Sequence, residues 1–146
     1  MELVLRFTAS LFVFLCLATP AFASNRNYFS PEVVQGAKTV SLQQAKDLFD
    51  AGHVFVDVRN PRLFRRKHLP GSFHLDLKNG FEAAALAKIA KKDQPVVIYS
   101  SSIHCARGYR AAALAVSWGF TQVMYFRGGI VEWKKAAYPF NYTKGN

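Results

Sequence analysis

The sequence predicts an α/β domain built on a parallel sheet with helices on both faces. Three short runs, 54–58, 96–99 and 123–126, are apolar and rich in β-branched or aromatic residues, which is typical of strands buried on both faces. Helical segments separate these runs, and strands joined through helices form right-handed crossovers and parallel pairs. The chain has 146 residues and no internal repeat, so we expect one such domain.

The first elements are marked by their capping and breaking residues. A loosely ordered lead-in is expected at 24–37, before a helix. Ser41-Leu42-Gln43-Gln44 resembles a capping box that opens this helix, and Gly52 ends it. The strand at 54–58 follows directly, and Asn60-Pro61 breaks it.

The second half of the domain repeats the alternation of helix and strand. A basic turn leads through Leu69-Pro70-Gly71 to a short extended piece at 73–75. Helices are expected at 81–91 and 109–118, on either side of the second strand. After the third strand a glycine pair turns the chain into a last helix around 131–133.

The N-terminus is predicted to be an export signal. Arg6 precedes an apolar core at 11–17, and Ala21-Phe22-Ala23 supplies a small-x-small cleavage pattern before Ser24. The apolar run is short for a spanning helix, so an uncleaved membrane anchor is the less favoured alternative. We therefore expect a periplasmic or secreted protein. The predicted organisation is a signal peptide at 1–23, a lead-in at 24–37 and the domain at 38–146.

The charge balance is strongly basic, with 19 Lys and Arg against 9 Asp and Glu and a net charge of +10. Apart from Arg65-Arg66-Lys67 the cations are scattered, and an exported protein seldom meets nucleic acid, so nucleic-acid binding is not expected. A basic surface that attracts small anions or an acidic partner is the better interpretation.

One cysteine remains once the signal peptide, which contains Cys16, is removed. Cys105 heads a C-x-x-G-x-R run that leads into an alanine-rich helix. In a parallel sheet such a loop lies at the carboxyl ends of the strands, where helix N-termini favour thiolates and bound oxyanions. We expect an anion cup that holds a reactive sulfur. The candidate substrate-binding residues are Arg107, Gly108, Tyr109 and Arg110.

Three segments together resemble the rhodanese-like family. Residues 55–59 with Phe64 and 68–72 are similar to its first signature, residues 105–110 to its active-site loop, and residues 128–139 to its C-terminal pattern. The resemblance implies sulfurtransferase activity without a cofactor. Cys105 would take sulfane sulfur from a small anionic donor such as thiosulfate, become a persulfide, and pass the sulfur to cyanide or a thiol.

One departure from the family pattern concerns the loop. The family's catalytic cysteine follows its strand directly, whereas here Ser100-Ser101-Ser102-Ile103-His104 precedes Cys105. Either the strand runs on, or a loop lengthened by five residues carries the thiol and Ser100 stands where the usual cysteine would be. The alternative function is a non-catalytic binding or accessory module, with a periplasmic protein partner. A phosphatase of the cell-cycle class fits poorly, because its loop spaces cysteine and arginine by five residues and this one by four.

Supporting residues complete the predicted site. The resemblance suggests that Asp57 and Arg59 form a structural pair near its mouth and that His68 fixes a loop through hydrogen bonds. His104 either assists deprotonation of the neighbouring thiol or is an exposed loop residue. The histidines show no metal-ligand spacing, so no metal site is expected.

Overall fold

The computed structural model describes residues 28–142. The predicted signal peptide, its cleavage site and Cys16 lie outside the described residues. Within the described part of the chain, no helix is long and apolar enough to cross a membrane.

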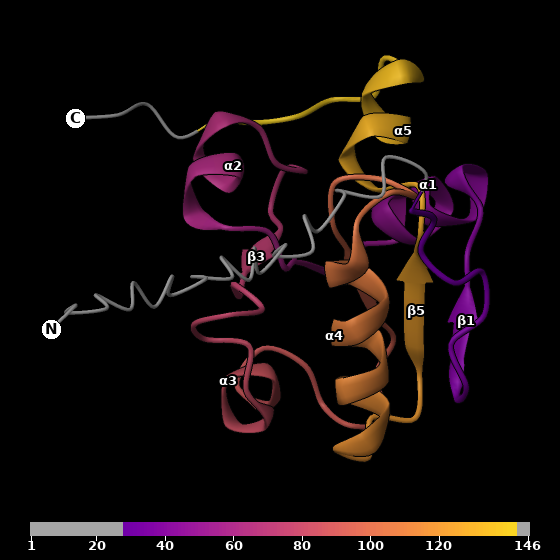
Figure 1. Cartoon of the computed structure of the whole chain (residues 1–146), viewed down its shortest axis with the longest axis vertical. Helices are drawn as coiled ribbons and strands as arrows, with labels where there is room; N and C mark the ends of the chain where they lie inside the picture. The colour runs from indigo at the N-terminus through magenta and orange to yellow at the C-terminus, as the bar shows by residue number, and fades with distance from the viewer. Residues whose placement is uncertain (1–27, 143–146) are drawn as a thin grey trace, which may run out of the picture.

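A five-stranded sheet forms the centre of the domain (Figure 1). The strand order is β1-β5-β4-β2-β3, and every pair is parallel. Asp57 pairs with Tyr99 and Tyr99 pairs with Phe126, so the three central strands end at the same level. The strands are β1 (Ala37–Thr39), β2 (Val54–Asp57), β3 (Phe73–His74), β4 (Val96–Tyr99) and β5 (Val123–Phe126).

Helices cover both faces of this sheet, as predicted. On one face α3 and α4 pack on Val56, Ile98 and Tyr125, and on the other α1 and α5 pack on Phe55 and Val97. Successive strand residues point to opposite faces, which is why both faces of these apolar strands are buried. The helices are α1 (Leu42–Asp50), α2 (Pro61–Arg66), α3 (Ala83–Ala87), α4 (Ala106–Ser117) and α5 (Gly129–Lys135).

The lead-in is more ordered than the sequence predicted. β1 begins at Ala37 and pairs with β5, although it lies at the end of a segment expected to be loose. Ser30 and Val34, earlier in the same segment, are buried. Three strand residues carry too short a pattern to be recognised alone, so the order comes from the tertiary pairing with β5.

The helices also depart from their predicted bounds. The basic turn contains α2, which Asn60 caps through its side chain and Pro61 opens at its first position. Ser41 and Gln44 form the predicted capping box of α1. Helix α3 is shorter than the predicted 81–91, and α4 begins at Ala106 instead of Tyr109, so that Cys105 is its N-cap residue.

Candidate functional site

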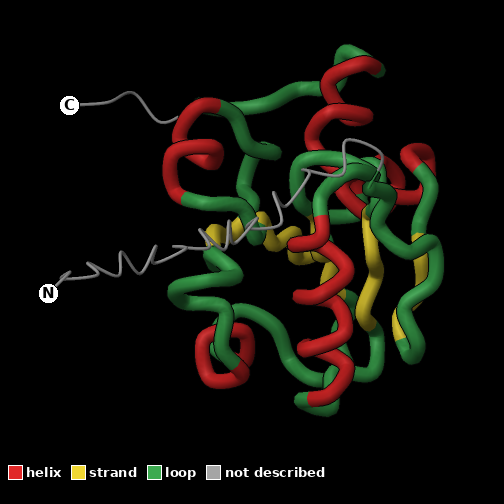
Figure 2. The backbone as a smooth tube through the Cα atoms, viewed as in Figure 1, coloured by secondary structure: helices red, strands yellow, loops and turns green. Residues whose placement is uncertain are grey.

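The loop that carries Cys105 starts directly at the end of β4. The strand stops at Tyr99 and does not run on, so Ser100 occupies the position immediately after the strand. The backbone carbonyls of Ser100 and Ser101 accept hydrogen bonds of 3.0 Å from the N–H groups of Ile130 and Val131 in α5. Figure 2 shows this loop and the start of α5 at the same end of the sheet, toward which β5 points in Figure 1.

Gly129 permits this close approach of α5 to the loop. Its φ is +59°, and a Cβ there would lie 2.3 Å from the carbonyl oxygen of Ser100. Neither the backbone angle nor the space suits another residue. Gly129 of the C-terminal pattern therefore allows the loop to lie against α5.

Cys105 is a free thiol at the N-terminus of α4. Its backbone N–H donates to the Ser102 carbonyl at 2.9 Å, and its side chain is half-buried and makes no capping hydrogen bond. No acidic residue lies in the first turn of this helix. The unpaired N–H groups of a helix start carry partial positive charge, so this position favours a thiolate or a bound anion.

The two arginines of the C-x-x-G-x-R run have different partners. Arg107 forms an ion pair of 2.5 Å with Asp76 and donates to the Val58 carbonyl. Burial would raise the pKa of Asp76, but the Arg107 guanidinium and the Lys78 N–H hold it below the usual value. Arg110 is exposed, and its guanidinium carbon lies 6.0 Å from the centre of the Tyr109 ring.

These contacts differ from the expected anion cup, in which Arg107 and Arg110 were both candidates for binding the substrate. The charge of Arg107 is balanced by a carboxylate, which weakens its attraction for a bound anion. Arg110 donates to the Tyr109 hydroxyl at 3.4 Å and, with the neighbouring Tyr28, lowers the pKa of Tyr109. The structure does not bring the two guanidinium groups onto a common partner.

Gly108 allows α4 to pack closely on the start of the loop. It is buried, and a Cβ there would lie 3.0 Å from the Tyr125 ring and 3.1 Å from Oγ of Ser100. The sequence placed Gly108 among the substrate-binding candidates, and in the structure its close neighbours are Ser100 and Tyr125 of β5. Gly108 therefore allows the helix to pack closely against the sheet.

The lead-in anchors the loop from the other side. Ser30 donates to the Ile103 carbonyl from its N–H at 2.7 Å and its hydroxyl at 2.9 Å, and Tyr125 donates to Oγ of Ser30 at 3.0 Å. Arg127 donates two hydrogen bonds to the Ser30 carbonyl. The sequence does not indicate these anchoring residues, because the lead-in contains no recognisable pattern.

His104 is also held by the lead-in. Its Nδ1 lies 2.9 Å from the Tyr28 carbonyl oxygen, and its ring centre lies 4.7 Å from that of Phe29. The side chain is exposed. Of the two roles left open by the sequence, this placement favours the exposed loop residue.

The end of β2 carries a buried ion pair. Nε and Nη2 of Arg59 donate to the Asp57 carboxylate, with distances from 2.6 to 3.1 Å, and Nη2 also donates to the Lys67 carbonyl. Both side chains are almost fully buried. Burial, together with Asp57, raises the pKa of Tyr99 well above its usual value. The Tyr99 hydroxyl accepts from the Leu69 N–H, so the pair and its surroundings tie the turn at Leu69 to the sheet.

His68 belongs to the same structural region. Its Nδ1 lies 2.9 Å from the Phe64 carbonyl oxygen, and its ring stacks on that of Phe64 with 4.0 Å between centres. Its backbone forms an antiparallel bridge with Asn141 near the C-terminus. These contacts are those of a residue that fixes a loop.

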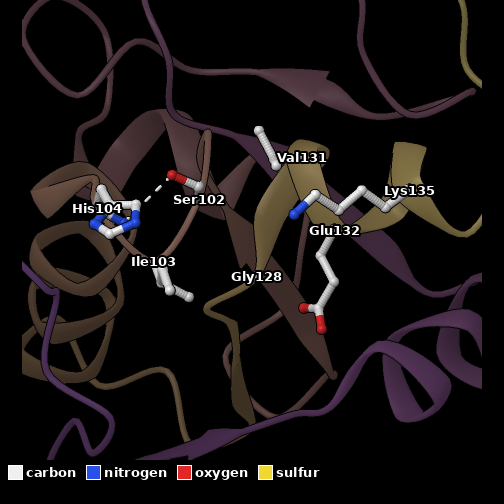
Figure 3. Close-up of a pocket in the computed structure, with 7 residues that line it drawn as sticks. All are labelled: Ser102, Ile103, His104, Gly128, Val131, Glu132 and Lys135. Carbon is white, nitrogen blue, oxygen red and sulfur yellow. Dashed lines mark hydrogen bonds between the residues drawn. The ribbon is translucent and has the colours of Figure 1, made fainter.

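In the part of the chain that the structure describes, hollows border the loop on the side of Ser101 and on the side of Ser102, and Cys105 lines neither of these. One has a volume of about 320 Å³ and is lined by Ser102, Ile103 and His104 on one side and by Glu132 and Lys135 of α5 on the other (Figure 3). The other, about 260 Å³, lies between α2 and α5 and borders Ser101. Among residues 28–142, no group of three His, Cys, Asp or Glu side chains could hold a metal ion.

Comparison with known proteins identifies the family. The rhodanese-like domain family matches residues 41–136. The chain belongs to the rhodanese-like family. This sequence is 34% identical over 108 residues to the thiosulfate sulfurtransferase GlpE of Pseudomonas syringae pv. syringae, covering 74% of the chain and 96% of the relative. It is 37% identical to that of Pseudomonas savastanoi pv. phaseolicola, covering 74% and 96%.

Solved structures show the same rhodanese fold. A protein from Bacillus halodurans superposes with a TM-score of 0.65 at 21% identity, covering 73% of this chain and 77% of that one. A human single-domain sulfurtransferase superposes with a TM-score of 0.58 at 24% identity, covering 66% and 95%. The predicted family and fold class are confirmed.

Proposed function

We propose that this rhodanese-like protein is a sulfurtransferase that moves sulfane sulfur through a persulfide on Cys105. The observation that carries the proposal is the position of this thiol. Cys105 is half-buried, its side chain makes no capping hydrogen bond, and it lies at the N-terminus of α4, beyond the carboxyl ends of the parallel strands. The relatives reported above, 96% of whose length this chain covers, are thiosulfate sulfurtransferases. Thiosulfate is accordingly the proposed donor, and cyanide or a thiol the acceptor.

The reaction proceeds in two displacements at sulfur. The Cys105 thiolate attacks the outer sulfur of thiosulfate, a sulfur–sulfur bond forms, and the bond to the sulfonate sulfur breaks with release of sulfite. A thiolate or cyanide then attacks the outer sulfur of the persulfide, and the electron pair of the broken bond returns to Cys105. The N-terminus of α4 stabilises the negative charge of the thiolate and of the persulfide.

The second candidate is a non-catalytic binding module, and a specific observation favours it. Ser100, not a cysteine, follows β4 directly, and Arg107 is already paired with Asp76. Under this alternative the fold and the loop would serve recognition alone.

Mass spectrometry of the intact protein after thiosulfate treatment separates the two candidates. The proposal expects one added sulfur atom, removed again by cyanide with formation of thiocyanate. Cys105→Ser is the matched control and should gain no sulfur, because a hydroxyl cannot form a persulfide. A wild-type protein that remains unmodified with thiosulfate and with mercaptopyruvate would favour the binding module.

We also propose that the protein is exported and acts in the periplasm or outside the cell. The charged start, the apolar run and Ala21-Phe22-Ala23 support this proposal. N-terminal sequencing of protein from the cell envelope should begin near Ser24. A full-length N-terminus on cytosolic protein would overturn it.

A further inference from the structure

The hollow between α2 and α5 is lined by cations that have no acidic partner among the described residues. Arg66 and Lys67 line it from the α2 side and Lys134 from α5, and no Asp or Glu lines it. Among the ion pairs of residues 28–142, none involves these three side chains. Arg59 also borders the hollow, but Asp57 balances its charge.

The three cations lie close enough to act on one another. Partial burial and the neighbouring charges of Lys134 and Arg66 lower the pKa of Lys67. Like charges held together repel, and an anion bound between them relieves the repulsion. The charged surface continues along α2 through the exposed residues Arg62 and Arg65.

Part of the lining of the hollow is apolar. This part, called the floor below, consists of Leu63, Ile130 and Val131, and Val131 is exposed. The volume of about 260 Å³ lies below the range of roughly 300–1,000 Å³ typical of sites for whole small-molecule ligands. One apolar side chain with carboxylates on either side fits this floor and rim better than a cofactor does.

We propose that the cationic hollow between α2 and α5 docks an acidic polypeptide segment of a partner protein. An apolar side chain of the partner sits on the floor, and carboxylates pair with Arg66, Lys67 and Lys134. The charge extends along α2 and across to Lys134 of α5, which exceeds what a single small anion can cover. Complementary charge of this kind speeds association and orients the partner.

The hollow lies beside the loop that leads to Cys105, which relates docking to sulfur transfer. Ser101, in the loop that leads to Cys105, lines the hollow, so a docked partner lies next to the thiol's loop. This step rests on the proposed function: the partner would present the acceptor thiolate, which attacks the outer sulfur of the Cys105 persulfide. The acceptor becomes the persulfide, and Cys105 returns to the thiolate.

Adjacent lysines of α5 provide a matched test. Lys134 lines the cationic hollow, whereas Lys135 lines the other hollow, next to Glu132 (Figure 3). The probe is a fluorescently labelled peptide in which pairs of glutamates alternate with single leucines, and binding is followed by polarisation. Lys134→Glu and Arg66→Glu should each weaken binding by about five- to tenfold, and Lys135→Glu by about twofold.

Further controls make each outcome decisive. A peptide with glutamine in place of glutamate should not bind, and Lys134→Gln replaces Lys134→Glu if that variant does not fold. Equal weakening by both lysine reversals would show an unspecific response to net charge and overturn the proposal. Displacement of the peptide by thiosulfate, but not by chloride at matched ionic strength, would assign the hollow to a small oxyanion instead.

Binding and chemistry can fail separately in this design. Cys105→Ser should bind the peptide as the wild type does, because Cys105 does not line the hollow. Peptide binding by a wild type that forms no persulfide would keep the docking surface and reject the sulfurtransferase proposal. The reverse result, a persulfide without peptide binding, would reject the docking surface alone.

Discussion

The ends of two neighbouring strands, β2 and β4, lie at the same level of the sheet but are built differently. At the end of β2, Asp57 and Arg59 are buried and satisfy each other's hydrogen bonds. At the end of β4, the loop leads to Cys105, which is half-buried and has no side-chain capping bond. A charged group that is already paired has few hydrogen bonds left for a ligand. A thiol without a side-chain partner at a helix start remains free to react with one.

Residues with a structural role and residues with a proposed catalytic role thus lie at neighbouring strand ends. At the end of β2, Arg59 holds the turn that precedes His68 by donating to the Lys67 carbonyl. Arg107 pairs with Asp76 after β3. The family signature thus contains both kinds of residue, and their chemical type alone does not tell them apart. Substitutions at the two strand ends should therefore have opposite effects on activity and stability.

The largest effect is expected at the β4 end. Cys105→Ser should reduce thiocyanate formation from thiosulfate and cyanide to the rate without enzyme, because the persulfide cannot form. Its melting temperature should stay close to that of the wild type. Ser100→Ala is the matched control and should retain turnover, since its buried hydroxyl is a packing neighbour of Gly108. Loss of turnover in Ser100→Ala alone would move the chemistry to the strand end.

Asp57→Asn should show the opposite pattern at the β2 end. It leaves the buried Arg59 without its counter-charge and should cost about 3 kcal/mol of unfolding free energy, with a modest loss of activity from loop disorder. Asp50→Asn breaks only the exposed pair with Lys46 and should cost less than about 1 kcal/mol. Thermal unfolding of both variants measures the difference. A large loss of turnover with unchanged melting would contradict a structural role for Asp57.

An intermediate effect is expected for the pair of Arg107 and Asp76, and it should depend on pH. The pKa of Asp76 is lowered in the folded state, so its stabilisation is present above the unfolded pKa and lost as pH falls through the folded pKa. Asp76→Asn should cost about 1–2 kcal/mol at pH 7. The difference in unfolding free energy between Asp76→Asn and the wild type should narrow below about pH 4.

Urea unfolding at pH 7 and at the lowest pH where the protein stays folded tests this narrowing. Glu32→Gln, which removes an exposed pair with Arg127, should show a small gap at either pH. A gap for Asp76→Asn that stays constant down to pH 3 would show that the carboxylate does not stabilise the fold through its charge.

The fold and the candidate thiol could be predicted from the sequence, but the residues that contact the loop before this thiol could not. Strand hydrophobicity and capping residues are local signals, and they located β2, β4, β5 and α1. The pairing of Arg107 with Asp76 joins residues 31 apart, and nothing in either segment indicates the other. The loop register depended on where β4 stops, which the contacts of Ser100 and Ser101 with α5 determine.

The smallest effect on stability is expected in the lead-in. The lead-in supports the loop after β4, and the ion pair of Asp57 and Arg59 supports the end of β2. Ser30→Ala removes the hydroxyl that donates to Ile103 and accepts from Tyr125, and should cost about 1 kcal/mol. Tyr125→Phe removes the same bond from the other side, so the double variant should cost less than the sum of the two single ones. Hydrogen exchange of the Cys105 N–H should quicken in Ser30→Ala, because its acceptor Ser102 lies in the loop that Ser30 anchors. Additive costs together with unchanged exchange at Cys105 would mean that the loop keeps its shape without the lead-in, through its contacts with α5.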